Sequence, residues 1–195
     1  MNKIIFATNN ENKVAEVKVI LNEKFQILSL KEAGIDIDIP EPYCTLEENA
    51  REKAQVIHRL TRQNCFAEDT GLEVKSLNSE PGVKSARYAG EERSFEKNID
   101  KLLSKLANKE NRKAQFRTVI CLICNGKEKV FEGICKGTII AERRGNSGFG
   151  YDPVFVPEGS TKTFAEMTII EKNVFSHRKK AIEKLTTYLK SNSCF

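Results

Sequence analysis

The sequence predicts an α/β fold with a mixed β-sheet, and three observations carry this prediction. Short apolar runs typical of buried strands alternate along the chain with segments of helical periodicity. Two of the helical segments begin at capping signals. Two long strand-like runs are joined at Asn125-Gly126, a dipeptide typical of a tight antiparallel hairpin. Strands that mix with helices and include such a hairpin predict a mixed sheet.

The first part of the chain contains a short strand and two helices. We expect a buried strand at 3–7 and a helix at 8–23, whose apolar stripe is Val14, Val17, Ile20 and Leu21. A second helix is expected at 45–62, because Thr45 and Glu48 form a capping-box pattern. Its core face consists of Leu46, Ala50, Ala54 and Ile57.

The rest of the chain supplies most of the strands. In order, we expect strands at 65–69 and 72–77, a helix at 94–107, strands at 114–124 and 127–140, and a helix at 177–190. Ser94 is the expected cap of the 94–107 helix. The sequence has no repeats and no clear linker, so residues 1–195 are expected to form a single domain, as one body or two closely packed lobes.

Composition favours an ordinary globular protein. Hydrophobic residues are 39% of the chain and charged residues 30%. No apolar run approaches the roughly 20 residues that span a bilayer. The apolar part of the N-terminus covers only residues 4–7, too short for a secretory signal, so we expect a cytoplasmic protein with no membrane partner. A net charge of +5 suits anionic ligands without separating a nucleotide from a nucleic acid.

The six cysteines are expected to be small buried side chains in a reducing compartment. The one close pair, Cys121 and Cys124, has a Leu-Ile spacer inside a β-branched run. Zinc-binding pairs need a tight turn between the ligands and a second pair or histidines at ligand spacing. The pair is therefore not expected to bind zinc.

The first polar cluster is "ATNNENK", residues 7–13, where a strand is followed by a helix. Helix N-termini offer free N–H groups and a positive dipole end to phosphates. Thr8 and Asn10 can add donors and Lys13 a cation, although the Walker A pattern is absent. The alternative interpretation is that Asn9 or Asn10 only caps the helix.

The second cluster is the acidic pair Glu68 and Asp69, which ends an apolar strand before Gly71, with Glu41 upstream. Carboxylates at strand ends are suited to holding Mg²⁺ and orienting a water molecule. The alternative is a pair of solvent-exposed acids at a turn.

The third cluster is the loop at 145–159. Its glycines allow backbone to approach a ligand closely, and Phe149 and Tyr151 offer aromatic faces to a flat ring. The alternative is a turn-rich loop whose aromatic residues fill the core.

The fourth cluster is "EKNVFSHRKK", residues 171–180, where Lys172, His177 and Arg178 surround a helix start expected at Ser176. The alternative for each of them is a solvated helix end. An anion site, a metal site, a flat-ring site and a basic segment together indicate a nucleoside triphosphate, but the residues alone indicate neither its base nor the bond broken.

These clusters also carry a family resemblance, through motifs that extend in order along nearly the whole chain. They are "FATNNENK", "TLEENAREKA", "AEDTGLEV", "PGVKSARYAG", "GFGYDPVFVPEG", "TFAEM" and "EKNVFSHRKKA". With them the chain resembles the inosine/xanthosine triphosphate pyrophosphatases, house-cleaning enzymes for deaminated purine nucleotides.

The resemblance implies hydrolysis of a non-standard purine nucleoside triphosphate (ITP, dITP or XTP) at the α–β phosphoanhydride, giving a monophosphate and pyrophosphate. It implies an elongated α/β fold with two lobes enclosing an active-site cleft, usually as a homodimer. By its position in the motif, Asp69 resembles the general base of the family. Glu41, Asp69 and Glu68 resemble the acids of the family's magnesium site. The residues that stand, by position, where the family contacts its substrate are Thr8, Asn9, Asn10, Lys13, Lys53, Thr70, Phe149, Gly150, Tyr151, Asp152, Lys172, His177 and Arg178.

Two positions depart from the family pattern. Glu68-Asp69-Thr70-Gly71 stands where Asp-Asp-Ser-Gly is common, and Lys84 stands where tyrosine is frequent. The longer Glu68 side chain leaves its metal role open.

Three other functions remain as alternatives. The first is a Mg²⁺-dependent nucleotide phosphatase that releases orthophosphate. The second is a nucleic-acid-binding module, which would interleave basic residues with exposed aromatic ones, and the sequence shows little of that pattern. The third, a purely structural interaction protein, leaves the four clusters unexplained.

Overall fold

The computed structural model describes residues 3–21, 25–192 and 194, and the chain divides into two compact units. Unit 1 comprises Met1–Asp69, Thr118–Gly133 and Arg178–Phe195, and unit 2 comprises Thr70–Arg117 and Ile134–His177. Within the described ranges, no helix combines the length and apolar character that crossing a bilayer requires.

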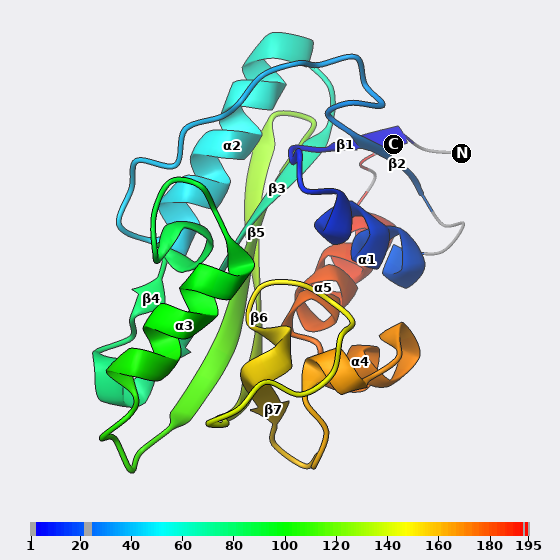
Figure 1. The fold of residues 1–195 in the computed structure, drawn as a ribbon. Helices are drawn as coiled ribbons and strands as arrows, with labels where there is room; N and C mark the ends of the chain where they lie inside the picture. Colours follow the sequence, from blue (N-terminus) through cyan, green and yellow to red (C-terminus); the bar gives the residue numbers. More distant parts are fainter. Residues whose placement is uncertain (1–2, 22–24, 193, 195) are drawn as a thin grey trace. The chain divides into compact units, whose positions relative to one another are not determined.

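The strands form a seven-stranded mixed sheet with the order β2-β1-β3-β5-β6-β7, and β4 pairs with β3 (Figure 1). β1 is parallel to β2 and β3, whereas β4 is antiparallel to β3 and β7 is antiparallel to β6. The predicted mixed α/β class is therefore confirmed. The strands are β1 (Lys3–Phe6), β2 (Gln26–Ser29), β3 (Cys65–Val74), β4 (Pro81–Gly82), β5 (Lys113–Cys124), β6 (Lys127–Ile139) and β7 (Phe155–Pro157).

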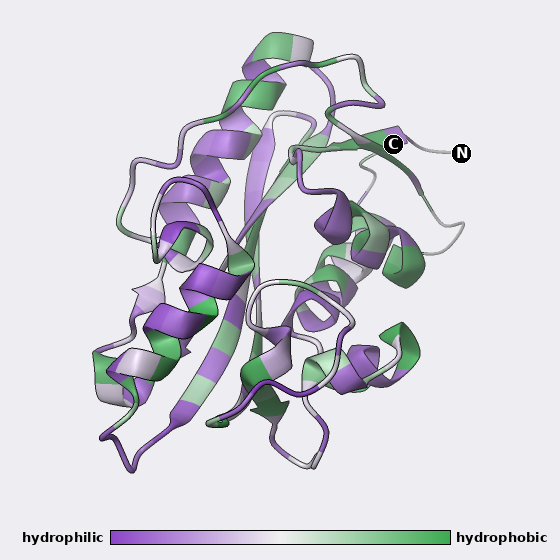
Figure 2. Cartoon of the chain, in the orientation of Figure 1, coloured by the Kyte–Doolittle hydropathy of each residue, from purple (hydrophilic) through white to green (hydrophobic). Residues whose placement is uncertain are grey.

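Two of the helices begin at the predicted capping signals. They are α1 (Glu11–Leu21), α2 (Leu46–Thr61), α3 (Phe95–Lys105), α4 (Ile169–Phe175) and α5 (His177–Ser191). The Thr45 side chain accepts a hydrogen bond from the Glu48 N–H, and the Ser94 side chain accepts one from the Lys97 N–H, so both predicted caps are confirmed. Hydrophilic and hydrophobic residues alternate along α2 and α3 in Figure 2, as expected of helices with one buried face.

Each unit has its own hydrophobic core. In unit 1, Phe6 of β1 stacks on Phe66 of β3 with ring centroids 4.5 Å apart, and apolar residues of α1 and α5 join them. In unit 2, Phe155 packs against Phe116 and Phe164, with centroids 4.7 and 5.2 Å apart. Burying each such side chain stabilises the fold by roughly 1.5–3 kcal/mol.

The boundaries differ from the prediction in several places. The helix predicted at 8–23 begins at Glu11, and its last two predicted residues lie outside the described residues. Strands β2, β4 and β7 and helix α4 were not predicted, because each is short and lacks a strong periodic pattern. The hairpin turn is confirmed: Asn125 and Gly126 have φ angles of 50° and 73°, in the left-handed region.

The strands predicted at 65–69 and 72–77 are one continuous strand, β3, so the expected end of a strand at Asp69 is wrong. Leu72 pairs with Gly82 of β4, and a Cβ atom at position 71 would lie 2.6 Å from the Gly82 carbonyl oxygen. Gly71 is thus required for the close approach of a neighbouring backbone rather than for a turn.

We expect Gly71→Ala to destabilise the protein by roughly 1–3 kcal/mol, because the added methyl group displaces the β4 backbone. The measurement is the denaturation midpoint in urea. Gly90→Ala is the matched control, since the nearest atom to a Cβ there is the Glu92 Oε1, 3.9 Å away. Equal midpoints for the two variants would contradict this account of Gly71.

The expectation of free cysteines is wrong for one pair, because Cys124 and Cys194 form a disulfide with their Cα atoms 5.6 Å apart. Asn64 holds both segments: its Nδ2 donates to the Cys194 carbonyl oxygen (2.6 Å), and its Oδ1 accepts from the Asn125 N–H (2.8 Å). The two cysteines are separated by 70 residues, so no local spacing indicates their pairing. The other cysteines are free: Cys65, Cys121 and Cys135 are buried, and Cys44 is exposed.

Candidate active site

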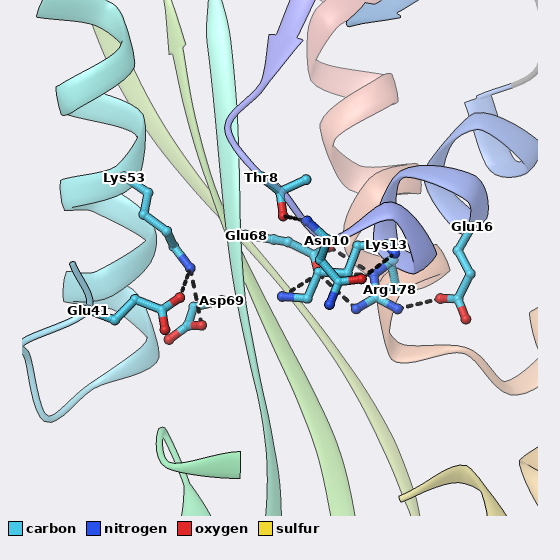
Figure 3. A network of polar contacts seen from close by, with 9 residues as sticks. All are labelled: Thr8, Asn10, Lys13, Glu16, Glu41, Lys53, Glu68, Asp69 and Arg178. Atoms are coloured by element: carbon cyan, nitrogen blue, oxygen red, sulfur yellow. Dashed lines mark hydrogen bonds and ion pairs between the residues drawn. The ribbon is translucent and has the colours of Figure 1, made fainter. Parts of the chain in front are cut away.

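The acidic pair lies near the middle of β3, and its two side chains point to opposite sides of the strand. Neighbouring residues on a strand face opposite ways. Figure 3 shows Asp69 directed toward the side of α2 and Glu68 toward the side of α1. Both are buried, with 6% and 1% of their surface exposed, so the predicted alternative of surface acids at a turn is wrong. Each acid belongs to a different polar cluster of unit 1.

The Asp69 cluster consists of Asp69, Glu41 and Lys53 (Figure 3). Lys53 Nζ donates to Glu41 Oε1 at 2.6 Å and to Asp69 Oδ1 at 3.3 Å. The capped helix α2 presents Lys53, whereas Glu41 comes from the segment before that helix. Asn49 fixes this segment: it accepts from the Tyr43 N–H and donates to the Tyr43 carbonyl oxygen, at 3.0 and 3.1 Å.

Burial dominates the electrostatics of Asp69. Burial and, less strongly, the nearby Glu41 carboxylate raise the pKa of Asp69, although Lys53 and Lys13 act against them. Burial alone would lower the pKa of Lys53, but Asp69 and Glu41 outweigh it and hold that pKa above its ordinary value. Asp69 Oδ2 is buried and accepts no hydrogen bond from the described residues. The cluster thus holds a partly desolvated carboxylate with an acceptor atom left over.

The Asp69 cluster fits a magnesium ion chemically. Among the described residues, no three His, Cys, Asp or Glu side chains gather as a metal site. Mg²⁺, however, is commonly bound by one or two carboxylates together with substrate phosphates. Glu41 and Asp69 supply two carboxylates, and the unpartnered Asp69 Oδ2 is a suitable oxygen ligand.

The Glu68 cluster consists of Glu68, Arg178, Lys13 and Glu16 (Figure 3). Arg178 binds Glu68 in a forked arrangement, with Nε–Oε2 and Nη2–Oε1 distances of 2.9 and 2.7 Å, and its Nη1 also donates to Glu16. Lys13 Nζ lies 3.2 Å from Glu68 Oε1. Although burial would raise it, the pKa of Glu68 lies well below its ordinary value because Arg178 and Lys13 stabilise the charged form.

The Glu68 carboxylate points away from Asp69 and is bound by two cations, Arg178 and Lys13. Its metal role stays a prediction. Arg178, predicted to contact a purine base, is 1% exposed and binds two carboxylates. Its base contact stays a prediction.

The predicted phosphate-binding turn leads into α1. Asn10 Oδ1 accepts from the Lys13 N–H at 3.1 Å, so Asn10 caps the helix, as the alternative interpretation has it. Thr8 Oγ1 accepts from the Asn10 N–H (3.2 Å), and Asn9 Nδ2 donates to the Ile37 carbonyl oxygen (2.8 Å). The cap orders the turn without excluding an anion at the other N–H groups of the helix start.

A separate polar cluster in unit 2 contains the predicted loop residues. Lys172 Nζ donates to Asp152 Oδ2 at 2.6 Å, and both side chains are buried. The Asp152 Oδ2 also accepts from the Phe149 N–H (3.0 Å), and the ammonium lies 5.1 Å from the centre of the Phe149 ring. Gly148 is required here, because a Cβ would lie 2.1 Å from the same Asp152 oxygen. The structure thus brings Phe149, Asp152 and Lys172 together.

The remaining predicted residues of unit 2 have mixed surroundings. Tyr151 belongs to the core, and its hydroxyl donates to the Ser85 carbonyl oxygen (2.9 Å), as the core-filling alternative predicts. His177 stacks on Phe116 with centroids 4.8 Å apart. Gly150 has a φ of 61°, and a Cβ atom there would meet no other described residue within 4 Å. Thr70 is the half-buried neighbour of Asp69 on β3.

Two residues that position site groups were not predicted from the sequence. Glu16 binds Arg178, and Asn49 orients the segment that carries Glu41. Glu16 follows Lys13 by three residues, which places both side chains on one face of the helix. This spacing could have indicated that Glu16 lies near the site. Asn49 had no such signal, because its partners are backbone groups.

The fold and these clusters define a class: a mixed α/β protein with buried acid–lysine groups beside a strand-to-helix turn suited to phosphate. The Ham1 family profile matches residues 4–188. A dITP/XTP pyrophosphatase of Flavobacterium psychrophilum is 50% identical over 97% of this chain and 100% of its own length. That of Porphyromonas gingivalis is also 50% identical, over 97% and 98%.

Solved structures agree with this match. The Staphylococcus aureus Ham1 protein superposes with a TM-score of 0.87 at 40% identity, covering 97% of this chain and 99% of its own. A HAM1 protein from Coxiella burnetii gives 0.89 at 37% identity, covering 98% and 100%. The chain belongs to the Ham1 family.

Proposed function

We propose that this protein is a pyrophosphatase for non-standard purine nucleoside triphosphates, namely dITP, XTP and ITP. The names of its relatives in Flavobacterium psychrophilum and Porphyromonas gingivalis support the substrate class. The structural observation that carries the proposal is the Asp69 cluster, in which one lysine binds two carboxylates beside an unpartnered Asp69 oxygen. The reaction adds water across the α–β phosphoanhydride and gives a nucleoside monophosphate and pyrophosphate.

Asp69 is proposed as the general base. A water oxygen forms a bond to the phosphorus, the bond to the leaving pyrophosphate oxygen breaks, and the water proton passes to the Asp69 carboxylate. Burial suits Asp69 to this role, because the same burial that raises its pKa makes its charged form a stronger base.

Mg²⁺ is proposed as the cofactor, held by Glu41 and Asp69. When bound, it supplies positive charge that neutralises the polyphosphate. The residues proposed to bind the triphosphate alongside it are Thr8, Asn9, Asn10, Lys13 and Lys53. A triphosphate needs several donors and cations to spread its charge in the transition state, and these residues supply both.

Recognition of the sugar and base is proposed for Thr70, Phe149, Gly150, Tyr151, Asp152, Lys172 and His177, with Arg178 as a further base contact. Inosine and xanthosine carry a 6-oxo group where adenosine carries an amine. A donor to that oxygen discriminates between them, because adenine would leave a buried polar group unpaired. The Lys172–Asp152 pair and the Phe149 ring support this assignment.

The proposal also includes a single domain made of both units, a homodimer and a cytoplasmic location. The family resemblance supports these three points, and no nucleic-acid partner is proposed. Light scattering of the purified protein tests the dimer: a mass of one chain would contradict it.

A nucleotide panel with Mg²⁺ tests the proposed function. We expect dITP, XTP and ITP to be hydrolysed in preference to ATP and GTP, with monophosphate and pyrophosphate formed in equal amounts. Monophosphate is measured by chromatography. Pyrophosphate is measured by a coupled assay that contains no phosphatase, so that pyrophosphate and orthophosphate are distinguished as primary products. Orthophosphate and a nucleoside diphosphate as primary products would contradict the proposal and favour the alternative, a phosphatase that acts on the terminal phosphate.

A further inference from the structure

The Lys53 ammonium lies between the two carboxylates that are proposed to bind Mg²⁺. It is 2.6 Å from Glu41 Oε1 and 3.3 Å from Asp69 Oδ1, and the side chain is buried (Figure 3). The pair comes from different segments, since Glu41 precedes α2 and Asp69 lies on β3. Lys53 is therefore the group that joins the two acids.

A lysine in this position is electrostatically similar to a metal ion. Two neighbouring carboxylates, here the buried Asp69 and the half-buried Glu41, repel each other unless a cation lies between them. One ammonium offsets only one of the two negative charges and offers directional N–H donors, and Asp69 Oδ2 receives none of them. A divalent cation would offset both charges and could bind oxygens that the ammonium does not reach.

An ammonium and a divalent cation cannot both occupy the space between Glu41 and Asp69, because like charges at that separation repel strongly. The Lys53 ammonium can move away from the two acids, because a lysine carries its charge at the end of a flexible four-carbon chain and lacks the rigid guanidinium of an arginine. A polyphosphate would offer the displaced ammonium a new anionic partner.

We propose that Lys53 is a placeholder cation: it holds Glu41 and Asp69 at the spacing a divalent cation needs, and it leaves them when that cation binds. This inference rests on the proposed function, from which it takes Glu41 and Asp69 as the metal-binding residues. Lys53 is accordingly a positioning residue for the acids before it is a contact of the phosphates. Metal binding must then displace an existing ion pair, which weakens the affinity of the nucleotide-free protein for the metal.

The test measures Mn²⁺ binding to the nucleotide-free protein, using the electron paramagnetic resonance signal of unbound Mn²⁺. We expect Lys53→Met to bind Mn²⁺ about 10-fold more tightly than the wild type, because the competing charge is gone. The matched control is Lys18→Met, which removes a lysine from an exposed ion pair with Glu32 and should leave the affinity unchanged. An equal or weaker Mn²⁺ affinity in a folded Lys53→Met protein would overturn the proposal.

A second measurement uses the wild type and decides the matter if Lys53→Met does not fold. In crystals soaked with Mn²⁺ alone, anomalous scattering should place the ion between Glu41 and Asp69, with Lys53 Nζ more than about 4 Å from both carboxylates. Lys53 still bridging both acids, or no ion at this position, would overturn the inference. Neither measurement involves turnover, so failure of the nucleotide panel is a separate outcome.

Discussion

Replacing Asp69 with asparagine is expected to lower kcat for dITP roughly 100- to 10,000-fold, the usual contribution of a positioned general base. Asparagine has almost the same shape, but it cannot accept the proton of the attacking water. Lys53 keeps its 2.6 Å contact with Glu41, so the local structure should persist. KM should change less than kcat, because most substrate contacts come from other residues.

The matched control for this prediction is Asp100→Asn. Asp100 is exposed and pairs with Arg143 at 2.6 Å, so the same chemical change there should leave kcat unaltered. Circular dichroism and thermal melting establish that both variants are folded. Near-wild-type kcat in Asp69→Asn would remove Asp69 from the mechanism.

Replacing Arg178 with methionine is expected to destabilise unit 1 by roughly 3–5 kcal/mol, the usual cost of removing one partner from a buried ion pair. Arg178 is fully buried, and its guanidinium binds both Glu68 and Glu16. Without it, Glu16 loses the partner that Arg178 supplies, and Glu68 keeps the Lys13 contact at 3.2 Å. The measurement is the free energy of unfolding in urea.

The matched control is Arg143→Met, which breaks an exposed pair with Asp100 and should cost at most about 1 kcal/mol. A second variant tests the cause directly. If the loss comes from buried negative charge that Arg178 no longer offsets, adding Glu68→Gln to Arg178→Met should recover part of the stability. A loss no larger than that of Arg143→Met would contradict the account of this cluster.

The difference in unfolding free energy between wild type and Arg178→Met should depend on pH in one direction. The pKa of Glu68 in the folded protein is lowered from its ordinary value of 4.5. Its contribution to stability is therefore fully present above that value and is lost as the pH falls toward the lowered folded-state pKa. The difference in unfolding free energy between wild type and Arg178→Met should consequently shrink as the pH falls below 4.5.

Local signals in the sequence determined much of this protein. The caps at Thr45 and Ser94 and the turn at Asn125-Gly126 depend on contacts within a few residues, and the structure has them where the sequence predicts them. Apolar periodicity located the long helices for the same reason. The residues of the polar clusters could also be named, because most of them lie in short contiguous stretches of the sequence.

Only the tertiary structure decided how those groups are divided and paired. Glu68 and Asp69 are neighbours in the sequence. Because side chains alternate along the continuous strand β3, the two acids point to opposite sides and contact different residues. β3 continues through Gly71, where the backbone of Gly82 approaches closely.

The partners themselves lie far apart along the chain. Arg178 is 110 residues from Glu68, and Cys124 is 70 residues from Cys194. Such pairings arise when the sheet and the helices pack together, and no residue spacing encodes them. The sequence by itself therefore determined which residues carry the charge and the local structure, and the packing decided which charges meet, because burial forces each buried ion to find its partner in space rather than along the chain.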